Sequence, residues 1–249
     1  MWSGPLHHYL EVPMSTYTPS AMSTSPTPPP SSGMPTAPRR SPAGRLGILL
    51  VLPLAPAFIA VLRFILPYYQ STENADVVRD VTAHQGSMNA VIWLGFLASL
   101  TLPVAAVLAA RPFAVLAPRL TTVAEFLLVP AYLCLSWLVV GDAILLRGVR
   151  SSVDTATIGT FFTGLHPVAD LAVGIFVVGH VLGTVLLGVA AIRTRAVPLW
   201  AAVALTVCQP VHLIALVVLG SPTLDLIGWG LNAVAFGVIA VTIVRTSEA

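Results

Sequence analysis

Charge is scarce in this sequence. Only 9% of its 249 residues are charged, whereas a soluble domain typically carries about 25%. Lysine is absent, so every basic residue is an arginine, and the net charge of +2 is too small to suggest a nucleic-acid partner. Because 56% of the residues are hydrophobic and the mean hydropathy is +0.89, most of the chain must be solvated by lipid.

Cysteine and the usual site motifs are equally scarce. Cys134 and Cys208 both lie inside apolar runs, where a lone cysteine behaves as a small hydrophobic residue. Two separated cysteines make neither a disulfide framework nor a metal site. The sequence has no H-x-x-x-H or H-E-x-x-H motif, no phosphate-binding loop and no nucleophile–base pair. We therefore expect no catalytic residues, no metal site and no cofactor.

Six apolar runs are each long enough to cross a bilayer, which takes about 20 residues. They are residues 46–66, 88–110, 121–141, 167–192, 198–219 and 226–244. A segment surrounded by lipid must satisfy its own backbone hydrogen bonds, so each run is expected to be helical. The predicted fold class is all-α, a six-helix transmembrane bundle spanning residues 46–245, with the lipid bilayer as its main partner.

Residues 1–45 have a different composition. They are rich in Pro, Ser and Thr and have no apolar periodicity, which predicts a disordered N-terminal tail. Arginine is enriched in cytoplasmic loops. With six spans, both termini are expected to be cytoplasmic, because one side then receives Arg39, Arg40, Arg45, Arg111, Arg119, Arg193, Arg195 and Arg245.

Two connections on the outer side carry helical patterns too short to span. Val77, Val78 and Val81 share one helical face in the first. In the second, helical spacing joins Ile158, Phe161, Phe162 and Leu165. Asp154 or Ser152 could cap the start of that second segment. We expect two short amphipathic helices that lie on the outer membrane surface or fold over the end of the bundle.

A candidate polar cluster lies within the membrane. His180 falls near the middle of its run, and an ionisable group at that depth must face protein, water or a ligand. His212 and Asn232 are expected at nearly the same depth, with Gln209 one turn deeper than His212. Thr184 follows His180 by one turn on the same helical face. These five residues form the predicted intramembrane cluster.

A candidate outer mouth lies nearer the surface. His166 and Asp170 form an i, i+4 pair at the start of the fourth span. Arg63 is expected to end the first helix, and Asp142 the third. Together with the intramembrane cluster, these residues predict a polar funnel that opens outward and narrows toward His180.

The pieces "GHVLGTVLLG", "RAVPLWAA", "QPVHL" and "LDLIGWGLNAVAFG" carry a resemblance. Over residues 46–245 the chain resembles a family of uncharacterised polytopic membrane proteins from high-GC Gram-positive bacteria. The resemblance implies a six-helix protein of the bacterial plasma membrane. It implies no activity and no substrate.

Three functions remain open for the funnel. The first is a non-enzymatic role, in which the cluster either binds a small-molecule ligand or only fixes helix packing through hydrogen bonds among His180, His212, Gln209 and Asn232. The second is a small proton-coupled transporter, because the histidine pKa lies near physiological pH. The third is a metal- or haem-dependent membrane enzyme with paired histidine ligands. The sequence favours the first.

Overall fold

The computed structural model describes residues 41–163 and 166–246, and this part of the chain is helical without any strand. Six of its helices are long and apolar enough to cross a membrane, which confirms the predicted fold class. They are α1 (Pro42–Ile65), α3 (Gln85–Ala110), α4 (Pro118–Arg150), α6 (Pro167–Thr194), α7 (Leu199–Leu213), which a π-helical segment extends to Val218, and α8 (Pro222–Thr246). The predicted tail lies largely outside the described residues.

The first helix begins earlier than predicted. Ser41 is its N-cap, and the Ser41 hydroxyl accepts a hydrogen bond from the Gly44 amide at 3.2 Å. Pro42 follows at the first helical position, where proline lacks only an amide hydrogen that would have no partner anyway. The expectation that the tail reaches residue 45 is therefore wrong for residues 42–45.

The third span is longer than predicted. Helix α4 continues through Gly141 to Arg150, so Asp142 lies inside the helix and does not end it. The additional turns are stabilised by burial, because Leu145 and Leu146 pack into a second apolar cluster at this end of the bundle. An isolated glycine inside a helix costs only about 1 kcal/mol relative to alanine, which that burial offsets.

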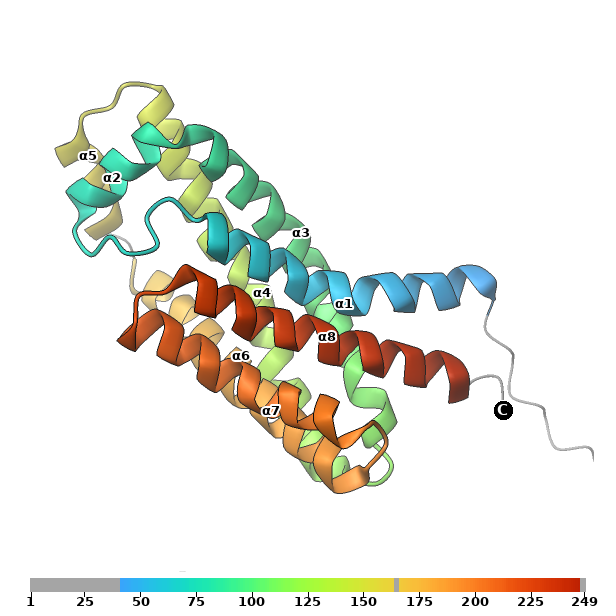
Figure 1. Ribbon diagram of the computed structural model, residues 1–249. Coiled ribbons are helices and arrows are strands. Elements are labelled where there is room, and N and C mark those ends of the chain that lie inside the picture. The colour runs from blue at the N-terminus through green and yellow to red at the C-terminus, as the bar shows by residue number, and fades with distance from the viewer. Residues whose placement is uncertain (1–40, 164–165, 247–249) are drawn as a thin grey trace, which may run out of the picture. The chain divides into compact units, whose positions relative to one another are not determined.

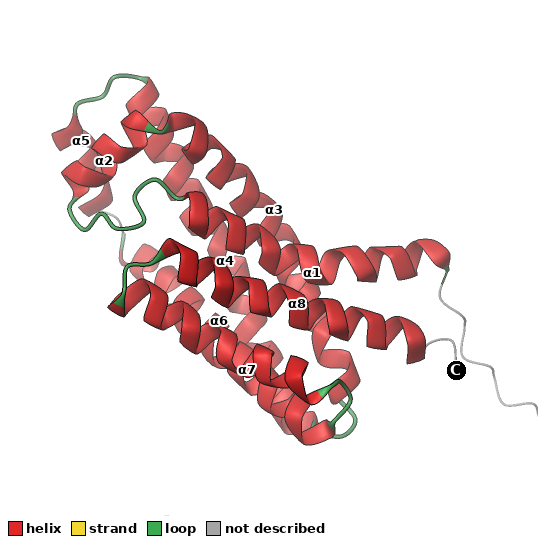
Figure 2. Ribbon diagram, in the orientation of Figure 1, coloured by secondary structure: helices red, strands yellow, loops and turns green. Residues whose placement is uncertain are grey.

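The six long helices form a closed ring. In order around the ring, α1 packs against α3, α3 against α4, α4 against α6, α6 against α7, α7 against α8, and α8 against α1 (Figure 1). Consecutive long helices are antiparallel, and the connections between α3 and α4 and between α6 and α7 are short (Figure 2). Side chains from several helices therefore meet inside the ring.

Two short helices pack at one end of the ring. Helix α2 (Asn74–Ala83) buries Val78 and Val81, and α5 (Thr155–Thr163) buries Ile158, in one apolar cluster with residues of α3 and α4. Asp154 caps α5 by accepting a hydrogen bond from the Thr157 amide at 2.9 Å. Both segments thus fold over the ends of α3 and α4, at the upper left of Figure 1.

The expected apolar face of α5 is only partly buried. Ile158 packs against Gly148, whereas the Phe161 side chain is exposed. The Phe162 side chain and Leu165 lie outside the described residues.

Helix α6 approaches its neighbours closely at glycines. A Cβ atom at Gly179 would lie 2.6 Å from the Leu127 carbonyl oxygen and 2.8 Å from the Ala131 Cβ. At Gly228 of α8, a Cβ would lie 3.0 Å from the Cys208 carbonyl oxygen and 3.1 Å from the His212 amide nitrogen. These contacts fix the register of α6 against α4 and of α8 against α7.

Candidate functional site

His180 points into the ring. The residue is 1% exposed, and its imidazole stacks between the Phe176 ring at 4.6 Å and the Trp229 ring at 5.6 Å. Its Nδ1 donates to the Phe176 carbonyl oxygen at 2.5 Å. A neutral imidazole has one donor and one acceptor nitrogen, so Nε2 is the acceptor, and it is buried without a partner among the described residues.

His212 lies beside His180, with their ring centroids 5.6 Å apart. Its main partner is Asp225, whose Oδ1 is 2.5 Å from His212 Nδ1. Such a short distance to a carboxylate indicates that Nδ1 carries the proton and donates it. Trp229 Nε1 is 3.3 Å from the same Nδ1, and that nitrogen cannot accept while it donates. Trp229 therefore packs against the pair more than it hydrogen-bonds to it.

Asp225 is the centre of this network, and the sequence did not single it out as a site residue. Its side chain is fully buried in the first turn of α8. Besides the His212 bond, Oδ2 accepts from Arg63 Nε at 2.8 Å and from the Tyr69 hydroxyl at 2.8 Å. The Arg63 guanidinium also lies over the Tyr69 ring, 4.6 Å from its centroid. Segments from α1, α7 and α8 are thus joined through one carboxylate.

The other predicted cluster residues are buried without partners. Gln209, Asn232 and Thr184 are each 0% exposed, and so is Tyr132 of α4, which the sequence did not single out. Neither amide atom of Gln209 or Asn232, nor the hydroxyl of Thr184 or Tyr132, has a hydrogen-bond partner among the described residues. The alternative in which His180, His212, Gln209 and Asn232 hydrogen-bond directly to one another is therefore wrong. His212 bonds Asp225, His180 bonds the Phe176 carbonyl, and the two amides have no partner among the described residues.

These orphaned polar groups are costly. A buried donor or acceptor left without a partner costs about 1–3 kcal/mol, and more in lipid, where water is not available as an alternative. Native proteins bury few such groups, and each one needs an explanation.

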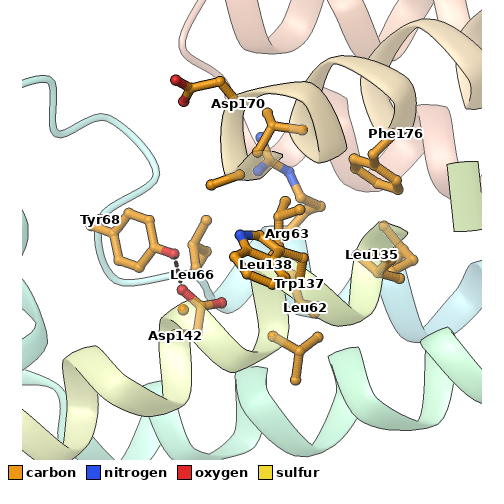
Figure 3. Close-up of a pocket in the computed structure, with 15 residues that line it drawn as sticks. Leu62, Arg63, Leu66, Tyr68, Leu135, Trp137, Leu138, Asp142, Asp170 and Phe176 are labelled. Atoms are coloured by element: carbon orange, nitrogen blue, oxygen red, sulfur yellow. Dashed lines mark hydrogen bonds between the residues drawn. The ribbon is translucent and has the colours of Figure 1, made fainter. Parts of the chain in front are cut away.

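The predicted outer mouth is partly assembled. A cavity of about 290 Å³ lies between α1, α4 and α6, and Arg63, Asp142 and Asp170 all line it (Figure 3). His166 does not line it; this exposed side chain caps α6, with Nδ1 accepting from the Val168 amide at 3.3 Å. The described structure therefore joins three of the four predicted mouth residues in one cavity.

Most of the cavity wall is apolar or aromatic. Asp142 accepts a hydrogen bond from the Tyr68 hydroxyl, as the dashed line in Figure 3 marks. Tyr68 and Tyr69 follow directly after Pro67 and were not predicted as site residues. The remaining wall consists of Ile59, Leu62, Leu66, Leu135, Trp137, Leu138, Val139, Gly141, Ala169, Val173 and Phe176.

Both tyrosines hold their protons strongly. Burial, reinforced by the nearby Asp142 carboxylate, raises the pKa of Tyr68 well above its ordinary value. Burial and the hydrogen bond to Asp225 raise the pKa of Tyr69 to about 12. Near neutral pH both phenols are therefore neutral donors to their carboxylates.

The charges around the cavity do not balance. Arg63 is paired with Asp225, and Arg63 Nη2 is buried without a partner among the described residues. Neither Asp142 nor Asp170 has an ion-pair partner in the described part of the chain. Two carboxyl groups without an ion-pair partner therefore line the cavity beside aromatic rings, which is an environment that organic cations prefer.

Apolar side chains predominate in the inner half of the ring. Beyond Thr184, α6 contributes Leu187, which packs in one cluster with Leu128, Leu205 and Phe236, all 0% exposed. Polar side chains therefore reach from the α2–α5 end to the middle of the ring.

The described residues contain no group of three or more His, Cys, Asp or Glu side chains that could hold a metal ion. The ring centroids of His180 and His212, the paired histidines of the third predicted function, lie 5.6 Å apart, and His212 Nδ1 is engaged by Asp225. No protein-family model, curated protein or solved structure matches the chain, so the resemblance noted from the sequence stays a prediction.

Proposed function

We propose that this membrane protein binds a small organic cation from the outer side of a bacterial plasma membrane, in the cavity between α1, α4 and α6. The observation that carries the proposal is the cavity wall. It combines two carboxylates without a paired cation, Asp142 and Asp170, with the aromatic rings of Tyr68, Trp137 and Phe176.

The wall also supports selectivity for an amphipathic ligand. A cation near aromatic faces gains about 0.5–2 kcal/mol, the larger values applying where water is excluded. The leucines Leu62, Leu66 and Leu138 offer an apolar surface to the ligand body. An anion would have to approach Arg63, whose charge is already compensated by Asp225.

The proposed orientation has both termini in the cytoplasm. Among the described residues, the arginines at the end of the ring opposite α2 and α5 are Arg45, Arg111, Arg119, Arg193, Arg195 and Arg245. The α2–α5 end carries arginines too, but together with most of the acidic residues. An excess of arginine marks the cytoplasmic side, so the cavity would face outward.

The binding proposal is tested by calorimetry on the purified full chain. Benzyltrimethylammonium is the probe, and 3-phenylpropionate is the anionic comparator of similar size. We expect the cation to bind at least tenfold more tightly than the anion. Asp142→Asn should weaken cation binding about tenfold, which corresponds to about 1.4 kcal/mol, while the amide oxygen still accepts from Tyr68.

Asp154→Asn is the matched control, because Asp154 is an exposed acid at the same end that caps α5 and does not line the cavity. Equal binding of both probes, or equal losses in the two variants, would refute the proposal.

Proton-coupled transport is the second candidate, supported by one specific contact. Arg63 lines the cavity and also bonds Asp225, which in turn bonds His212. A cation in the cavity and a proton on His212 would therefore repel each other through a short chain of contacts. In proteoliposomes, this candidate requires cation uptake driven by a pH gradient and lost in His212→Gln; binding without flux would restrict the protein to the first function.

A further inference from the structure

A second polar region lies deeper than the cavity, inside the ring. We name it the core layer: Tyr132 of α4, Thr184 of α6, Gln209 of α7 and Asn232 of α8, all fully buried. The Tyr132 hydroxyl lies next to the Thr184 hydroxyl without completing a hydrogen bond. Because α8 runs antiparallel to α7 and Gly228 lies beside Cys208 and His212, Asn232 lies about one turn deeper than Gln209.

The core-layer side chains cannot simply move together. Backbone contacts at Gly179 and Gly183 hold α6 against α4, and the contact at Gly228 holds α8 against α7. In these fixed helix positions none of the four side chains has a hydrogen-bond partner among the described residues, which leaves a bridging molecule to satisfy them.

The chemistry of the core layer selects the occupant. Two amides and two hydroxyls offer both donors and acceptors and carry no charge. Water matches this combination, and buried waters typically make about three hydrogen bonds to otherwise unpartnered polar groups. The buried Nε2 of His180 adds one more acceptor beside the layer.

We propose that the core layer is an internal hydration site, in which water molecules bridge Tyr132, Thr184, Gln209 and Asn232 and reach His180. Further inward, Leu187, Leu205 and Phe236 are fully buried members of the apolar core. On the other side the core layer adjoins His180 and His212, which adjoin the Asp225 network. The site would bring water from the outer side to the middle of the membrane.

Hydroxyl-radical footprinting of the full-length protein in nanodiscs tests this proposal without any substitution. Radiolysis of bound water produces radicals that modify adjacent aromatic rings even when those rings are buried. Tyr132 and Phe236 are both aromatic and both 0% exposed, but only Tyr132 belongs to the core layer. We expect modification of Tyr132 at a rate at least tenfold above that of Phe236.

Repeating the experiment after transfer to ¹⁸O-labelled water should place the label on Tyr132, because the site exchanges with bulk water. Equal protection of Tyr132 and Phe236 would overturn the proposal. In a Gln209→Leu/Asn232→Leu variant, Tyr132 modification should fall toward the Phe236 rate. If this variant folds and its rate of Tyr132 modification is unchanged, the proposal is also overturned. If the variant does not fold, the comparison of Tyr132 with Phe236 in the wild-type protein decides.

Discussion

Replacing Asp225 by asparagine should destabilise the protein strongly. The carboxylate is fully buried and accepts three bonds, from Arg63 Nε at 2.8 Å, the Tyr69 hydroxyl at 2.8 Å and His212 Nδ1 at 2.5 Å. Asparagine keeps the shape but removes the charge, and its amide nitrogen must face one of these donors. One donor then loses its acceptor, and the Arg63 guanidinium loses its counterion.

Removing one partner of a buried ion pair costs about 3–5 kcal/mol. The Arg63 side chain is 20% exposed, so water partly compensates its charge, and we expect the lower end, about 3 kcal/mol. The matched control is Asp76→Asn, which breaks the Asp76–Arg79 pair at 2.7 Å. That pair is exposed on both sides, and exposed pairs contribute about 0–1 kcal/mol.

The assay is reversible unfolding by sodium dodecyl sulfate in mixed micelles at pH 7, followed by circular dichroism and tryptophan fluorescence. A loss in Asp225→Asn no larger than that in Asp76→Asn would refute the reasoning. The double variant Asp225→Asn/Arg63→Gln adds an internal test. If the cost comes from an uncompensated charge, the double variant should be less destabilised than the sum of the two single variants.

Further expectations concern packing, pH and topology. Gly179→Ala should lower the free energy of unfolding by about 1–3 kcal/mol through overpacking. Gly174→Ala should not lower it, because the space at its Cβ is open. Equal effects of the two substitutions would contradict the close contact between α4 and α6. The pKa of Tyr69 is about 10 in the unfolded chain and about 12 in the folded protein. The free energy of unfolding should therefore fall as the pH rises across that window, and it should fall less in Tyr69→Phe. A stability profile that is identical in both proteins would exclude this linkage. Ser152→Cys should react with an impermeant maleimide on intact cells and Val115→Cys, exposed at the opposite end, only after lysis; the reverse pattern would invert the topology.

Local sequence patterns located the helices but not all of their ends. Apolar runs of membrane-spanning length identified all six long helices, because lipid leaves the backbone no alternative to internal hydrogen bonding. The end of α4 was misplaced because Asp142 was taken as a boundary. Its carboxylate is instead accommodated inside the helix by a hydrogen bond from Tyr68, a contact across a large sequence separation.

The candidate site was only partly predictable. Membrane depth alone identified His180 and His212, and the structure brings their rings together. Asp225 was not singled out, because it directly precedes the sixth apolar run, where an acid commonly faces water near the positive end of the helix dipole. Its spacing to Trp229 and Asn232, four and seven residues later, is the signal that would have placed it on the buried face.

The sequence by itself determined how the chain is solvated and how often it crosses the membrane, since both depend on the composition of each segment taken alone. It also determined that an imidazole at mid-membrane depth turns inward. Only the tertiary structure decided that His212 pairs with Asp225 and that Gln209 and Asn232 remain without partners in the described protein. Those outcomes depend on the rotation of each helix and on its neighbours in the ring, which the packing of the whole bundle decides.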